Sequence, residues 1–209
     1  MATQLNLHAT QNNGIGATYF DMTTTASDTT LSTAVTNTTA SGTEIQFTQT
    51  AGGTLIQWIS GRTPAAGFTL TTATITLRAY ESDMSANTGG RARIFKRDSG
   101  GVETELGGGP FNDGVEFGTA PATVSWTCNV TDTAFAEDDR ILLKLYLTNV
   151  GTMGGGFTAT GNYDGTLLGT EVAFLNLNET VTFKSESANA ATQPKITAIN
   201  QSLARAASW

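Results

Sequence analysis

The sequence predicts an all-β protein, an antiparallel two-sheet β-sandwich with extended N- and C-terminal arms. Three observations predict this class. Apolar and polar residues alternate in several segments, the period of a strand with one face on a core. Gly-rich turns separate these segments, which suits jelly-roll-like or immunoglobulin-like connectivity. The 209 residues are 39% hydrophobic, with 23 Gly and 4 Pro, enough for one packed sandwich.

The N-terminal region, residues 1–43, is expected to lie outside the sandwich. Residues 1–20 place Leu5 and Leu7 among polar residues and glycines, which indicates an extended arm or a first strand. The following stretch, residues 21–42, is rich in Thr, Ser and Ala and has few large apolar side chains. Such a composition favours a long surface loop or an irregular edge strand.

The sandwich domain is assigned to residues 44–184. Its clearest strand contains Ala73, Ile75, Leu77 and Ala79 on one face, alternating with polar residues and Tyr80 on the other. Strands are predicted at residues 44–48, 55–59, 73–80, 91–97, 103–105, 122–130, 140–149, 157–161, 171–177 and 180–184. The remaining residues, 185–209, form a polar C-terminal tail in which a short amphipathic helix is an option.

Charge is concentrated in one predicted hairpin. Asp98-Ser99-Gly100-Gly101 supplies the turn residues that a short hairpin needs. The strand before the turn is basic and contains Arg91, Arg93, Lys96 and Arg97. The strand after it is acidic and contains Glu103 and Glu105. The basic strand either meets an acidic partner surface or pairs with these glutamates across its own hairpin, which helps to select the register.

The sequence carries few of the residues that catalysis uses, so we expect no enzyme activity and no cofactor. His8 is the one histidine, and we interpret it as an ordinary polar residue. The sequence lacks a G-x-S-x-G elbow, an H-E-x-x-H motif and a phosphate-binding loop. Cys128 is the one cysteine and lies on the apolar face of a strand, which indicates a core position.

A metal site is not expected, although three carboxylates near turns are candidates for calcium, namely Asp132, Asp138 and Asp139. The alternative for these residues is a solvated turn before the strand at 140–149. The net charge of −7 argues against general nucleic-acid binding. The start of the sequence does not resemble a signal peptide, and no apolar run reaches membrane-spanning length, so we expect a soluble protein made in a cytoplasm.

Aromatic residues suggest two kinds of contact. Trp58 and Trp126 lie in predicted strands, where each is either a core anchor or a platform for sugar stacking. Trp58, Tyr146 and Tyr163 are the candidates for glycan contact. Trp209 is the last residue of the sequence, and we expect it to dock in a groove of its own chain or of a neighbour.

Two motifs carry a resemblance to a known family. Arg91-Ala92-Arg93-Ile94-Phe95 matches an R-x-R-[IV]-[FY] strand, and Asp139-Arg140-Ile141 matches a later G-D-R-[IL] strand start, with Asp138 in place of Gly. This pattern resembles a β-sandwich domain of structural proteins of tailed bacteriophages and of some surface-associated bacterial proteins. The resemblance covers roughly residues 54–184. Its motifs are structural and include no catalytic residue.

The resemblance implies a non-enzymatic virion protein, synthesised in the host cytoplasm and localised to the virion. The leading hypothesis is a capsid decoration protein whose partners are the major capsid protein or other virion subunits, with a homo-oligomer in the assembly and neither nucleic acid nor membrane. The expected partner contacts are Leu5, Leu7, Arg91, Arg93, Lys96, Arg97 and Trp209. The alternatives are a carbohydrate-binding module that recognises a host-surface glycan, and a ring subunit of a tail or connector.

Overall fold

The computed structural model describes residues 2–12, 14–27, 33–38, 44–49, 53–152, 154–167 and 170–184. These residues form strands and one short 3₁₀ helix, η1 (Met84–Ala86). No helix in these ranges is long and apolar enough to span a membrane. The strands are β1 (Thr3–Gln11), β2 (Tyr19–Thr23), β3 (Thr33–Thr38), β4 (Glu44–Gln46), β5 (Gln57–Ser60), β6 (Phe68–Glu81), β7 (Thr88–Arg97), β8 (Glu103–Glu105), β9 (Phe111–Asn112), β10 (Ala122–Phe135), β11 (Arg140–Asn149), β12 (Thr158–Tyr163), β13 (Thr166–Leu167), β14 (Thr170–Glu171) and β15 (Phe174–Leu177).

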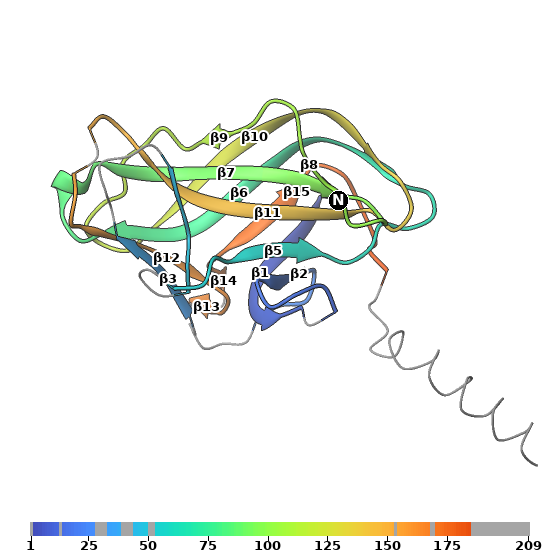
Figure 1. Cartoon of the computed structure of the whole chain (residues 1–209), viewed down its shortest axis with the longest axis horizontal. Coiled ribbons are helices and arrows are strands. Elements are labelled where there is room, and N and C mark those ends of the chain that lie inside the picture. Colours follow the sequence, from blue (N-terminus) through green and yellow to red (C-terminus); the bar gives the residue numbers. More distant parts are fainter. Residues whose placement is uncertain are drawn as a thin grey trace, which may run out of the picture.

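The all-β class is confirmed, but the predicted division into two sheets is not what the strand pairing shows. Thirteen strands form one sheet in the order β3-β12-β6-β15-β1-β2-β5-β11-β7-β8, with β10 on β6, β4 on β11 and β9 on β7. The sheet is mixed because β2 and β5 are parallel while the other pairs are antiparallel. β13 and β14 form a separate small hairpin. The large sheet curls into a half-barrel (Figure 1).

The two longest strands set the frame of the sheet. β6 pairs with β10 from Ala79↔Ala122 to Phe68↔Phe135, and an irregularity between Asn129 and Thr133 interrupts the register. Alternation explains this strand, because Ala73, Ile75, Leu77 and Ala79 are all buried on one face as predicted. The prediction of strands at 91–97 and 140–149 also holds, since β7 and β11 pair along ten residues each.

The core lies between the two curled halves of the sheet. Figure 1 shows β7 and β11 crossing in front of β6. Trp126 of β10 reaches across to β7, where a Cβ atom at Gly90 would lie 2.8 Å from its Cη2 atom. Gly90 therefore leaves the space that this indole occupies. Trp58 and Tyr163 meet edge to face, with ring centroids 5.2 Å apart.

The N-terminal residues do not form an arm. β1 lies inside the sheet between β15 and β2, with Thr3 opposite Leu177 and Asn6 opposite Thr23. β1, β2 and β3 belong to the same sheet as the later strands, so this sheet extends across the predicted boundary at residue 43. The strand predicted at 180–184 is reduced to a single bridge between Arg62 and Lys184. The predicted tail, 185–209, lies outside the described residues.

Candidate functional site

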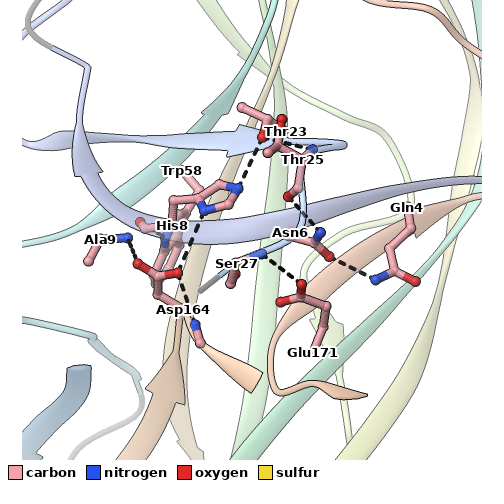
Figure 2. A network of polar contacts seen from close by, with 11 residues as sticks. Gln4, Asn6, His8, Ala9, Thr23, Thr25, Ser27, Trp58, Asp164 and Glu171 are labelled. Carbon is pink, nitrogen blue, oxygen red and sulfur yellow. Dashed lines mark hydrogen bonds and ion pairs between the residues drawn. The ribbon is translucent and has the colours of Figure 1, made fainter. Parts of the chain in front are cut away.

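A network of polar contacts joins β1 and β2 to the turn that follows β12 (Figure 2). The imidazole of His8 lies between two oxygens. Its Nε2 atom is 3.0 Å from Thr23 Oγ1, and its Nδ1 atom is 3.6 Å from Asp164 Oδ1. The indole Nε1–H of Trp58 donates to the carbonyl oxygen of His8 at 3.2 Å, which fixes the backbone beneath the ring.

The turn between β12 and β13 positions the carboxylate of this network. Asp164 has φ 63° and Gly165 has φ 85°, the left-handed conformations that Asp tolerates and Gly adopts freely. The backbone N–H of Gly165 donates to Asp164 Oδ1 at 2.9 Å, and that of Ala9 donates to Oδ2 at 2.8 Å. Two backbone amides therefore hold the Asp164 carboxylate in place, independently of its contact with His8.

The Thr23 hydroxyl, the His8 imidazole and the Asp164 carboxylate follow one another in the order of a proton relay. Their geometry, however, is that of a structural contact. A relay needs the carboxylate hydrogen-bonded to the imidazole, and 3.6 Å between Nδ1 and Oδ1 is too long. Thr23 Oγ1 also accepts the backbone N–H of Thr25 at 3.2 Å. We therefore interpret the network as one that holds β1, β2 and the β12–β13 turn together.

The network continues along the polar face of β1. Asn6 Nδ2 donates to the carbonyl oxygen of Thr25 at 2.8 Å, and Gln4 Nε2 donates to Asn6 Oδ1 at 2.7 Å. The backbone N–H of Ser27 donates to Glu171 Oε1 in β14 at 2.8 Å. These contacts fix the stretch after β2 against the sheet.

A groove of about 440 Å³ lies beside β1 and β2. Its apolar lining includes the buried residues Leu5, Met22, Ile59 and Val181, and Lys184 is among its partly exposed residues. The groove adjoins the His8 network, because Thr23 and Thr25 line it as well. The volume is within the range of small-molecule sites.

The basic strand is neutralised within the chain. Arg93 donates to Glu44 at 2.7 and 2.8 Å and to Glu105 at 2.9 Å. The hydrogen bond from Arg93 holds the pKa of Glu44 below its usual value against the opposing effect of burial, and the same bond raises the pKa of Arg93. Arg97 Nη1 lies 3.6 Å from Glu103 Oε1.

The other two cations of this strand also have partners. Arg91 donates to Asn112 Oδ1 at 2.6 Å and lies 3.4 Å from Glu44. Lys96 Nζ lies 3.9 Å from Asp139 and 3.4 Å from the carbonyl oxygen of Ala134. Pairing across the hairpin, one of the two interpretations of the charge pattern, is thus present, and Glu44 adds a partner from β4.

Two of the expected partner contacts lie in the interior. Leu5 and Leu7 are both fully buried in the central core. Their alternation with Asn6 and His8 gives β1 an apolar face, which packs inside the curled sheet rather than on another subunit. They are therefore core residues, and the expectation that they contact a partner is corrected. Trp209 lies outside the described residues.

Two of the three candidate glycan contacts are also core residues. Trp58 is 0% exposed and Tyr163 is 1% exposed, so neither can present a ring face to a sugar. Their apolar neighbours, among them Phe20 at 6.3 Å between ring centroids from Tyr163, account for this. Tyr146 is partly exposed, and the guanidinium of Arg93 lies over its ring at 5.7 Å.

The acidic turn before β11 is organised by hydrogen bonds and ion pairs. Asp139 is buried, and its Oδ2 atom accepts the backbone N–H of Ala136 at 2.8 Å. Asp138 lies 2.9 Å from Lys184 Nζ, and this hydrogen bond lowers the pKa of Asp138. Asp132 lies in β10 and is exposed. Across the described ranges, no three His, Cys, Asp or Glu side chains cluster as a metal site would require.

No family model matches the sequence, and no curated protein matches it. A CocE/NonD family hydrolase from Staphylococcus aureus matches 85% of this chain at 11% identity and a TM-score of 0.50. A selenomethionine-labelled alpha-amino acid ester hydrolase matches 87% of it at 8% identity and a TM-score of 0.51. The likeness is one of fold. This chain spans 36% of the length of each of these two structures.

Several residues of these sites were not singled out from the sequence. Asp164-Gly165 is a turn dipeptide shortly after the strand predicted at 157–161, and that signal could have placed the turn but not its contact with His8. Glu81, a buried residue at the end of β6, has a stronger sequence signal for an unusual environment. It occupies the next position on the buried face of Ala73, Ile75, Leu77 and Ala79, where a carboxylate needs a partner.

Proposed function

We propose that the chain is a non-enzymatic structural protein of a tailed-phage virion, a decoration protein on the outer capsid shell. The observation that carries the proposal is the placement of the two motifs that resemble such proteins. Arg91–Phe95 lies in β7 and Asp139–Ile141 leads into β11, and the two strands are paired, with Leu142 opposite Phe95 and Leu143 opposite Ile94. The two motifs thus lie side by side in one sheet.

Arg93, Asp139 and Arg140, polar residues of these motifs, make contacts within the chain. Arg93 bridges Glu44 and Glu105, and Arg140 Nη1 donates to the carbonyl oxygen of Ser60 at 2.8 Å from a buried position. Asp139 accepts a backbone N–H from its own turn. Such contacts stiffen the sheet and leave no reacting group in these motifs, which supports a structural role.

Attachment to the shell is assigned to the C-terminal residues 185–209. Leu5 and Leu7 are used by the core, so the N-terminal residues are not free to bridge subunits. The C-terminal residues include Ile196, Ile199 and Trp209, which offer apolar anchors for a capsid subunit or a neighbouring copy. Many weak contacts of this kind on a symmetric particle add up to stable binding.

The test is a binding assay on particles of the source phage that lack this protein. The full chain is expected to bind in a simple ratio to the major capsid protein, measured by quantitative mass spectrometry. Trp209→Ala is expected to lower the occupancy, while the neighbouring Ser208→Ala serves as the matched control. A copy number of a few dozen or fewer per particle would move the protein to the tail or connector. Absence from purified wild-type particles would refute the virion role.

A further inference from the structure

Glu81 is a buried carboxylate in which one oxygen accepts no hydrogen bond. It ends β6 on the buried face and is 1% exposed. Its Oε2 atom accepts the backbone N–H of Thr88 at 3.1 Å and the hydroxyl of Thr88 at 2.6 Å. Its Oε1 atom has no donor, although a buried oxygen of this kind is normally hydrogen-bonded.

The partner for this oxygen comes from the segment after β9, residues 113–118. Three backbone hydrogen bonds hold the segment along β6 and β7: Asp113 N–H to Gly90 O at 2.8 Å, Phe117 N–H to Thr88 O at 2.8 Å, and Glu81 N–H to Gly118 O at 3.0 Å. The last two of these bonds place Glu116 beside Glu81, and the interaction with the Glu116 carboxyl group is one of the causes that raise the pKa of Glu81. The Oε1 atom of Glu116 is also buried and also has no donor.

A single proton satisfies both oxygens. Two neighbouring ionised carboxylates repel each other, and burial makes the repulsion stronger. When one carboxyl is protonated, it donates to the other, and neither oxygen remains unpaired. Burial raises the pKa of Glu81, the Thr88 hydrogen bonds oppose this effect, and Glu116 raises the pKa further.

Other charged groups nearby do not remove the need for a proton. Asp83 caps η1 through the backbone N–H of Ser85. Asp113, at the start of the segment, is itself a partly buried carboxyl whose pKa burial raises. Arg91, the first cation along β7, is engaged with Asn112 and Glu44. Within the described residues, no ion pair to Glu81 or Glu116 is present.

We propose that Glu81 and Glu116 share one proton and that this proton latches the 113–118 segment onto β6 and β7. The latch is pH-dependent. Because the folded state binds the proton more tightly than the unfolded chain does, the stabilisation is complete at pH below the unfolded pKa of a glutamate. It is lost as the pH rises through the raised pKa of Glu81 in the folded state. The segment, which carries the exposed side chain of Val115, then opens. This inference is independent of the proposed virion role.

The test is amide hydrogen exchange on the full chain from about pH 4 to about pH 9, a range that includes the known pKa values of buried glutamates. The probes are the amides of Asp113 and Phe117, and the amide of Leu143 in β11 is the internal reference. Between the unfolded pKa of a glutamate and the raised pKa of Glu81 in the folded state, we expect the protection factors of the probes to fall by up to about tenfold per pH unit relative to Leu143, and to level off above it.

Glu116→Gln supplies a permanent N–H donor to Glu81, so the probe amides of this variant should keep their protection at alkaline pH. Glu137→Gln, an exposed Glu in an ion pair with Lys184, is the matched control and should behave like the wild type. Protection that does not depend on pH in the wild type would overturn the proposal, as would an equal loss in Glu116→Gln. Recovery of wild-type protection at alkaline pH on addition of Ca²⁺ alone would also overturn it, because a cation rather than a proton would then fill the site.

Discussion

Replacing Leu7 by alanine tests whether the N-terminal strand is part of the core or a detachable arm. Leu7 is 0% exposed in the middle of the curled sheet, with Met22 opposite it on β2. Truncating a fully buried Leu to Ala costs about 2–5 kcal/mol, because apolar contacts are lost and a cavity remains. For a chain of this size, a loss of about 3 kcal/mol lowers Tm by about 6–12 °C.

The assay is thermal unfolding followed by circular dichroism, with urea unfolding to obtain the change in free energy. Thr10→Ala is the matched control, since Thr10 lies on the same strand with an exposed side chain. Its Tm should stay within about 2 °C of the wild type, because exposed substitutions usually change stability by less than about 0.5 kcal/mol. If Leu7→Ala were as stable as Thr10→Ala, β1 would not be part of the cooperative core and the fold described here would be wrong in that region.

Three further predictions follow from the contacts above. Gly90→Ala should destabilise the protein by about 1–3 kcal/mol in urea unfolding, because the new Cβ would overlap the ring of Trp126; an unchanged midpoint would contradict the close approach. The lowered pKa of Glu44 contributes stability above its unfolded value that is lost as the pH falls through the folded value, so Glu44→Gln should flatten the acid side of the stability–pH curve, and a parallel curve would argue against the Arg93 pair. Burial raises the pKa of Cys128 to about 12, so this thiol should react with a thiol reagent only after unfolding; rapid labelling of the native protein would show that it is accessible.

The parts of the fold that the sequence predicted are those where one strand carries its own signal. β6 and β11 have long alternating runs, and the hairpin of β7 and β8 has a turn motif with opposite charges on its two sides. β1 has the same alternation in Leu5 and Leu7, but it is surrounded by polar residues and glycines. Its place in the sheet depends on β15, far along the chain, and no local pattern specifies that pairing.

The site residues show the same division between local and distant information. The sequence indicates that Glu81 continues a buried face, yet it does not indicate that Glu116 will meet it, because the two lie in different elements joined by backbone hydrogen bonds of the 113–118 segment. Trp58 and Tyr163 illustrate the reverse case. Their residue type is suited to sugar stacking, but the curl of the sheet brings them together inside the core.

The position of β1 has a consequence for how the protein matures during synthesis. Thr3 pairs with Leu177, so β1 cannot complete its pairing until β15, far along the chain, has left the ribosome. At roughly 5–20 residues per second, this delay is on the order of ten seconds or more. During that time, β1 and the strands that flank it expose unpaired edges and apolar side chains. A chain of this topology is therefore expected to depend on chaperones or on low expression levels to avoid aggregation, and its folding should be slow because so many contacts join distant residues.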